Sequence, residues 1–277
     1  MFHVRSPTAT TPKGVSWHQC DLLDPVSSDR LVQEIKASHL LHFAWYTAHG
    51  QYWSSRENVR WLQASLGLFD SFARYGGSRA VIAGSCAEYD WSGGCCNESS
   101  TPLVPGSVYG TCKHALRLVT ESVANQLRVS AAWGRIFFPF GPGEYRERLV
   151  ASVITNILKG EPARCSPGVQ ARDFMYAGDV ASAFVALLES DVEGAVNIAS
   201  GTALSVGELV GAIARRMGRP ELVHLGALPA AKDDPPLIVA DVRRLRDCVG
   251  WSPESRLEDA LDQTISWWKH ELRNDQN

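Results

Sequence analysis

The chain has 277 residues, of which 45% are hydrophobic, and its formal net charge at pH 7 is -3. A chain of this size and composition can bury the core of one domain, or of one domain with an added lobe. The near-neutral charge lacks the basic excess of a sequence-independent nucleic-acid binder, so we expect no nucleic-acid partner.

The cysteines, histidines and apolar runs narrow the class of protein further. The seven cysteines are odd in number and irregularly spaced, which argues against a disulfide framework and favours a cytoplasmic location. Neither the cysteines nor the histidines have the spacing of metal ligands, so we expect no metal site. No apolar run reaches the length of a membrane span, and the first residues lack the apolar centre of a signal peptide, so we expect no membrane partner.

Short apolar runs alternate with helical patterns in the first half of the chain. The run SHLLHFAW at 38–45 predicts a buried strand, and an amphipathic helix is predicted over 54–77. RAVIAGS at 79–85 predicts the next strand, followed by a helix over 108–127 and a strand over 129–138. This alternation predicts an α/β fold, a Rossmann-like doubly wound parallel sheet with helices on both faces.

The pattern becomes more mixed after residue 143. The predicted elements there are a helix over 147–159, a strand over 171–176, a helix from Val180, a strand over 194–200, a helix from Ser205 and a last helix from Leu257. We therefore expect a Rossmann-like cofactor domain at 1–143 and a smaller mixed α/β substrate lobe at 144–277. Some segments of this lobe are expected to return to the core of the first domain.

Three polar side chains are expected at one edge of the predicted sheet. Tyr109 and Lys113 lie one helical turn apart, and a nearby ammonium group favours the phenolate and lowers its pKa. Such a pair can move protons, although an aromatic residue and a lysine also occur four apart on many solvated helices. Ser85 ends a strand, where parallel sheets bind ligands and where serine also serves as an ordinary turn former.

Several motifs, in order along the chain, resemble those of a known family. They are LHFA (41–44), SCAEY (85–89), VYGTCK (108–113), GRIFFPFGPGE (134–144), ARDFMYAGDVASAF (171–184), NIASG (197–201) and GWSPESRLEDAL (250–261). Together they resemble the extended short-chain dehydrogenase/reductases, in particular the NAD-dependent epimerase/dehydratase group that modifies nucleotide sugars.

The resemblance implies catalytic roles for three residues. Tyr109 would donate a proton to the alkoxide that forms when hydride reaches a sugar carbonyl. Lys113 would lower the pKa of Tyr109 and bind the nicotinamide ribose, and Ser85 would orient the carbonyl group. The family also implies a homodimer, formed through the helices that begin near Ser54 and Val108.

The resemblance also implies binding residues. Those for the cofactor are Arg5, Asp21 (toward adenine), Ala44, Tyr109, Lys113 and Phe138, and those for the substrate are Ser85, Arg172 and Lys232. Arg172 would bind substrate phosphate; the alternative is a surface arginine paired with Asp173. The cofactor is NAD or NADP, and Arg5 favours NADP because an arginine there accommodates the 2′-phosphate.

Some family features are absent from this sequence. It has no Gly-x-x-Gly-x-x-Gly and no strand-turn-helix before Arg5, so we expect it to lack the first βα unit, which grips the pyrophosphate. Cys86 and Ala87 stand where sugar dehydratases carry an acidic pair. Ala87 and Gly143 stand where the epimerase-reductases of the family carry a cysteine and a histidine.

These absences leave hydride chemistry, and the sequence favours reduction of a 4-keto-6-deoxy nucleotide sugar. One alternative is a nucleotide-sugar C4 epimerase, which oxidises and re-reduces the same carbon. A second alternative is a catalytically silent relative that binds a nucleotide or a protein, since the glycine loop is missing.

Overall fold

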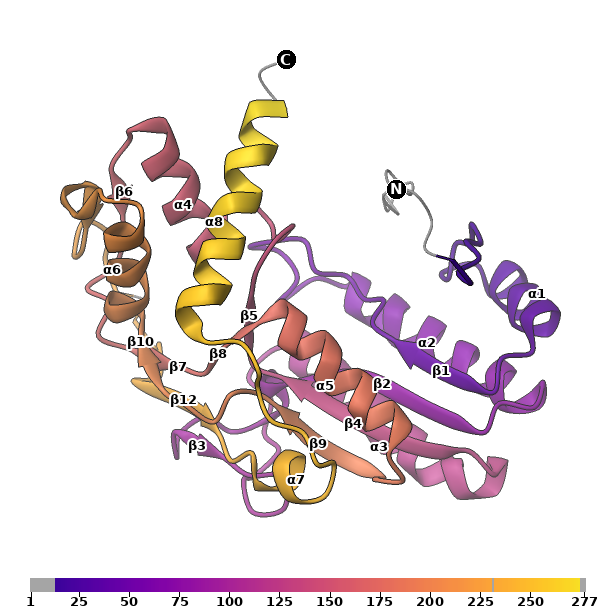
Figure 1. Cartoon of the computed structure of the whole chain (residues 1–277). Coiled ribbons are helices and arrows are strands. Elements are labelled where there is room, and N and C mark those ends of the chain that lie inside the picture. Colours follow the sequence, from indigo (N-terminus) through magenta and orange to yellow (C-terminus); the bar gives the residue numbers. More distant parts are fainter. Residues whose placement is uncertain (1–12, 231, 275–277) are drawn as a thin grey trace.

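The computed structural model describes residues 13–230 and 232–274, so the cofactor prediction for Arg5 lies outside the described residues. Figure 1 shows a sheet flanked by helices, and beside it a second group of elements that contains α4, α6 and α8. The helices are α1 (Pro25–Ile35), α2 (Glu57–Arg74), α3 (Val108–Leu127), α4 (Leu149–Lys159), α5 (Ala177–Glu189), α6 (Val206–Arg216), α7 (Arg243–Asp247) and α8 (Leu257–Asn274), with short 3-10 turns η1 (Cys86–Glu88) and η2 (Pro220–Leu222).

The main sheet confirms the predicted fold class. Its four strands are parallel and lie in the order β1 (His39–His42), β2 (Arg79–Ser85), β4 (Ser130–Ile136), β9 (Gly194–Ile198). The shorter strands are β3 (Cys95–Cys96), β5 (Phe138–Phe140), β6 (Ala163–Arg164), β7 (Ala171–Arg172), β8 (Phe174–Tyr176), β10 (Leu204–Ser205), β11 (Val223–His224) and β12 (Leu237–Ala240). They form three small sheets, β10-β7-β12-β3, β11-β6 and β5-β8.

Helices cover both faces of the main sheet because the strands are apolar on both sides. Along β2, Ala80 and Ile82 pack into the core formed with α2 and α3, whereas Val81 and Ala83 pack toward α5. All seven residues of β2 are buried, as the continuous apolar run predicts for a central parallel strand. A separate core joins α4, α6 and α8.

The predicted strand at 38–45 is too long and is not fully buried. β1 covers only His39–His42, and His39 is exposed because, in the described part of the chain, β1 pairs on one side only, with β2. The apolar residues after it leave the sheet, and Phe43 and Trp45 instead line a cavity. The helix α1, which has Asp24 as its N-cap, was not predicted from the sequence.

His42 provides a test of the packing between β1 and α2. It is buried, and its Nε2 lies 2.9 Å from the Ser65 hydroxyl oxygen. Burial, aided by the charge of Lys113, lowers the pKa of His42 from 6.5 to about 3. Between these values the unfolded chain binds a proton at this site and the folded chain does not, so the free energy of unfolding should fall as the pH drops.

We expect His42→Gln, which can still hydrogen-bond Ser65, to remove this contribution to the pH dependence. Urea unfolding of both proteins across this pH window measures it. As the pH falls, the free energy of unfolding should decrease more in the wild type than in the variant. A difference that stays constant with pH would contradict a buried neutral histidine.

Gly110 provides a test of how α3 sits against η1. A Cβ at Gly110 would lie 2.2 Å from the carbonyl oxygen of Ala87, so Gly110→Ala must push α3 away from this turn. We expect a loss of about 1–3 kcal/mol in unfolding free energy, the usual cost of overpacking. The matched control is Gly67→Ala in α2, where a Cβ meets nothing within 4 Å and should stabilise by about 0.5–1 kcal/mol. Similar effects from both variants in denaturant titrations would contradict the close contact.

Candidate active site

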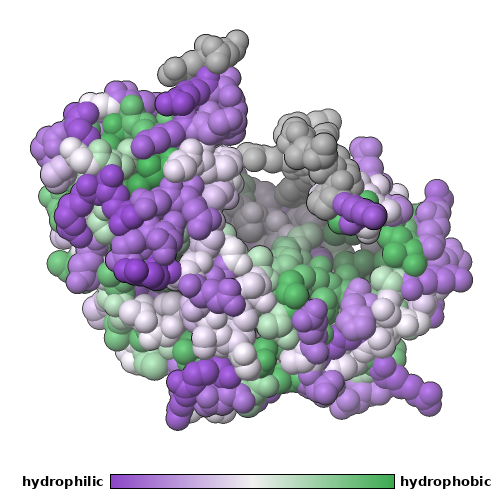
Figure 2. Space-filling view, viewed as in Figure 1, coloured by the Kyte–Doolittle hydropathy of each residue, from purple (hydrophilic) through white to green (hydrophobic). Residues whose placement is uncertain are grey.

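A cavity of about 580 Å³ lies where the main sheet meets the loop that leads to α4. It is lined by five of the residues that the sequence singled out: Ser85, Tyr109, Lys113, Phe138 and Arg172. Figure 2 shows the molecule hollowed between the α4, α6 and α8 group and the sheet, with hydrophobic surface beside the hollow. The cavity is therefore at the carboxyl ends of the strands, where parallel sheets bind ligands.

Local capping brings Ser85 and Tyr109 together. Ser85 ends β2 in an extended conformation, and its hydroxyl oxygen accepts from the Ala87 N–H (3.2 Å), which starts η1. Ser107 caps α3 by accepting from the Gly110 N–H (3.1 Å), so Tyr109 falls in the first turn of that helix. Both side chains line the cavity, and the Ser85 hydroxyl acts on the Tyr109 phenol in the direction that lowers its pKa.

The expectation that Lys113 lowers the pKa of Tyr109 is wrong. Burial raises the pKa of Tyr109 above its ordinary value, and the Ser85 hydroxyl only partly opposes this. Burial also lowers the pKa of Lys113 to about 7, so its ammonium group loses part of its charge near neutral pH. Tyr109 is therefore a neutral phenol in this site, which suits a proton donor better than a base.

Lys113 is held from two sides. Its Nζ donates to the Ala83 carbonyl (2.8 Å) and lies 3.9 Å from the centre of the Trp45 ring. Trp45 in turn donates from its indole nitrogen to Asn58 Oδ1 (2.8 Å), a fully buried side chain of α2. A cation over the face of a tryptophan is stabilised by the ring, which compensates part of the cost of burying Lys113.

Two further aromatic residues in this wall were missed from the sequence. The rings of Tyr52 and Trp53 meet the Tyr109 ring edge to face, with centroids 5.0 and 5.7 Å apart, and the Trp53 carbonyl accepts from the Tyr109 N–H (3.1 Å). They lie more than fifty residues before Tyr109 in a loop without periodicity, so only the folded chain reveals them.

Glu88 was also missed as a site residue in the sequence. It is fully buried, and its carboxylate accepts from the Ser85 N–H (2.9 Å), the Trp133 indole N–H (2.8 Å) and Arg135 Nε (3.1 Å). Arg135 also donates to the Tyr89 hydroxyl (2.8 Å). A buried ion pair of this kind is stabilising only when several hydrogen-bond donors satisfy it. The sequence offered one sign of this role, namely a glutamate within the SCAEY motif (85–89).

The alternative pairing of Arg172 with Asp173 is wrong. Arg172 is buried, forms an ion pair with Asp234 and donates to the Pro235 carbonyl (2.8 Å). Asp173 instead accepts from backbone N–H groups, those of Ser200 at 2.8 Å and Gly201 at 2.9 Å among them. These partners lie on loops that the sequence separates by tens of residues.

Three other predicted residues do not line this cavity. Asp21 lies in the turn before α1, where it accepts from the Leu23 N–H (2.9 Å). Ala44 follows β1 and packs against the core that includes α2 and α3. Lys232 is exposed in a turn two residues before Asp234. Their proposed binding roles therefore need a ligand that extends beyond the cavity.

The residues in the cavity fit the nicotinamide ribose end of a dinucleotide. Lys113 has three N–H donors, and the described residues provide one hydrogen-bond acceptor for it, Ala83, which leaves donors for ribose hydroxyls. Tyr109 and Ser85 lie at the same place, as a carbonyl substrate requires. The described part of the chain offers no glycine-rich loop at a helix N-terminus for the pyrophosphate.

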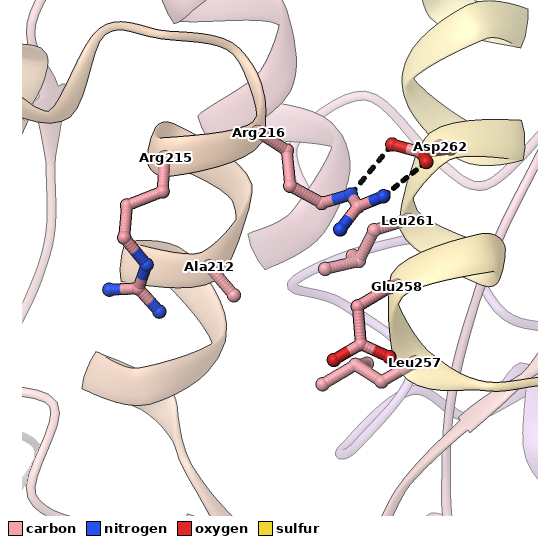
Figure 3. Close-up of a pocket in the computed structure, with 7 residues that line it drawn as sticks. All are labelled: Ala212, Arg215, Arg216, Leu257, Glu258, Leu261 and Asp262. Atoms are coloured by element: carbon pink, nitrogen blue, oxygen red, sulfur yellow. Dashed lines mark hydrogen bonds and ion pairs between the residues drawn. The ribbon is translucent and has the colours of Figure 1, made fainter.

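A second cavity, of about 440 Å³, lies between α6 and α8. Figure 3 shows Arg216 of α6 directed toward Asp262 of α8, and Arg216 Nε donates to Asp262 Oδ1 (2.6 Å). Arg215, on the same helix, points elsewhere. This bidentate pair ties α8 to the lobe.

The described residues contain neither a membrane-spanning helix nor a cluster of metal-binding side chains. None of the helices in residues 13–230 and 232–274 has the length and apolarity to cross a membrane. Within the same residues, no cluster of three or more His, Cys, Asp or Glu side chains could hold a metal ion.

Comparison with known proteins agrees with the geometry. UDP-glucuronic acid decarboxylase 1 of Xenopus tropicalis is 29% identical over 179 residues, which are 64% of this chain and 42% of that protein. dTDP-4-dehydro-6-deoxy-D-allose reductase of Streptomyces bikiniensis is 27% identical over 139 residues, 48% of this chain and 42% of that protein. The chain thus spans less than half the length of these relatives.

A solved structure and a family model extend the comparison. RMD from Pseudomonas aeruginosa, complexed with NADPH, superposes with a TM-score of 0.82 at 22% identity and covers 95% of this chain and 92% of its own. The family model described as "NAD dependent epimerase/dehydratase family" matches residues 3–199. The chain therefore belongs to the NAD-dependent epimerase/dehydratase family of the extended short-chain dehydrogenase/reductases.

Proposed function

We propose that this chain is an NAD(P)-dependent oxidoreductase that reduces the 4-keto group of a 6-deoxy nucleotide sugar. One observation carries the proposal: Tyr109, Ser85 and Lys113 line one cavity at the carboxyl ends of the sheet, and burial keeps Tyr109 a neutral phenol. The reductase from Streptomyces bikiniensis, whose name specifies a 4-dehydro-6-deoxy sugar, supports this choice of substrate class.

The residues of the chain have distinct tasks in this reaction. The Ser85 hydroxyl would donate a hydrogen bond to the substrate carbonyl oxygen, which gains charge as the reaction proceeds. The bound nicotinamide would supply the hydride. Tyr109 would then give its proton to the new alkoxide; because burial keeps the phenol neutral, this proton is in place when the alkoxide forms.

Substrate and cofactor contacts complete the proposal. Arg172 lines the cavity and would bind a substrate phosphate in place of Asp234, its present partner. Lys113 would hold the nicotinamide ribose. We favour NADP over NAD, on the basis of Arg5 alone. Cys86 and Ala87 leave no acidic pair for water loss beside Ser85.

The decisive test is Tyr109→Phe in an active form of the protein. We expect turnover of a 4-keto-6-deoxy nucleotide sugar to fall at least about a hundredfold, the usual scale for loss of a positioned general acid. Oxidation of NADPH, with NADH in parallel, measures the rate, and cofactor binding should stay nearly unchanged. Unchanged turnover would remove Tyr109 from the mechanism, while sugar conversion without net cofactor oxidation would identify an epimerase instead.

We also propose that α2 and α3 pair with a second copy of the chain. The exposed surfaces of these helices carry apolar side chains: Val59 on α2 and Val108, Leu118 and Val119 on α3, each 40–50% exposed. Apolar side chains grouped on adjacent helices are typical of a homodimer contact.

We expect Leu118→Glu to convert the dimer to a monomer, because a carboxylate would be buried at the contact. Sedimentation measures this directly. The matched control is Val185→Glu on α5, where the replaced side chain is 46% exposed but lies on the opposite face of the sheet. A monomeric wild-type protein, or equal effects of both variants, would contradict the proposed contact.

A further inference from the structure

Glu144 is a cavity residue that the mechanism above does not use. It lies in the loop between β5 and α4 and lines the same cavity as Ser85 and Tyr109. The turn that places it is closed by a hydrogen bond from the Glu144 N–H to the Gly141 carbonyl, and Gly143 adopts a positive φ of 77°. The Ala151 N–H in the first turn of α4 acts on the Glu144 carboxyl and partly opposes the effect of burial on its pKa.

One oxygen of this carboxyl group is left without a hydrogen-bond donor in the described part of the chain. Oε1 of Glu144 is buried and has no hydrogen-bond partner among the described residues. A buried polar atom left without a partner costs roughly 1–3 kcal/mol, so native proteins keep few of them. Because this atom belongs to a side chain that lines a cavity, a ligand can supply the missing partner.

The neighbours of Glu144 connect it to the reacting centre. Arg148 at the start of α4 and Tyr52 line the same cavity, and the charge of Arg148 acts on both Glu144 and Tyr52. Tyr52 in turn packs edge to face against Tyr109. Burial raises the pKa of Glu144 to about 7, so near neutral pH its carboxyl can both accept and donate a hydrogen bond.

A sugar hydroxyl matches this group, since it also both donates and accepts. A second carboxylate matches less well, because the site would then hold two like charges unless Glu144 first takes up a proton. We propose that Glu144 binds a ring hydroxyl of the substrate and thereby selects a neutral sugar over a uronic acid. This inference rests on the proposed function and separates the chain from a decarboxylase of UDP-glucuronic acid such as its relative in Xenopus tropicalis.

Calorimetric binding of UDP, UDP-glucose and UDP-glucuronate tests the inference without relying on turnover. Wild type should bind UDP-glucose at least about tenfold tighter than UDP-glucuronate, the ratio that corresponds to one charge-assisted hydrogen bond. Glu144→Gln keeps an acceptor for Ala151 but removes the charge, so this ratio should fall to about threefold or less. UDP binding should not change, because the inference places Glu144 at the sugar.

Glu147→Gln is the matched control, since it removes an exposed carboxylate from the same loop and should leave the ratio as in wild type. Thermal unfolding monitored by circular dichroism verifies that both variants fold. An unchanged ratio in Glu144→Gln, or a wild type that binds UDP-glucuronate more tightly, would overturn the inference while leaving nucleotide-sugar binding intact. Failure of wild type to bind these sugar nucleotides, whether the base is uracil or thymine, would overturn the proposed function and this inference with it.

Discussion

The buried carboxylate of Glu88 is the interaction on which the geometry of the site depends. It joins the end of β2, through the Ser85 N–H, to Trp133 and Arg135 of β4. Burying a carboxylate is costly, and here three donors and the positive charge of Arg135 compensate that cost. Ser85 therefore cannot move relative to the sheet without breaking a network that has no access to solvent.

Burial has a second effect on the titrating side chains near this network. In Tyr109 burial is the largest effect on the pKa and raises it, and among the described residues only the Ser85 hydroxyl opposes it. The same burial lowers the pKa of Lys113 to about 7, which weakens the cation itself. A site that looks like an activated phenolate in the sequence is thus a neutral phenol beside a partly neutral amine, arranged for donating a proton.

The sequence predicts the elements whose pattern is local and fails where distant residues meet. RAVIAGS matches β2 because a central parallel strand is apolar on both faces, and the cap at Ser205 places the start of α6. The run at 38–45 predicts too long a strand, since an apolar residue that lines a cavity looks the same as one in a core. Ser85, Tyr109 and Lys113 could be predicted from spacing and motif. The partner of Arg172 could not, because Asp234 is 62 positions away.

The cavity has walls that belong to different hydrophobic cores. Tyr109 packs with the core of the sheet and α2, whereas the Glu144 loop leads into α4, whose buried residues pack with α6 and α8. Within the described part of the chain, the two cores share no buried residue. The spacing between proton donor and sugar contact is therefore set by how the two cores pack across the cavity, and a substitution inside either core can change the alignment of the substrate without touching it.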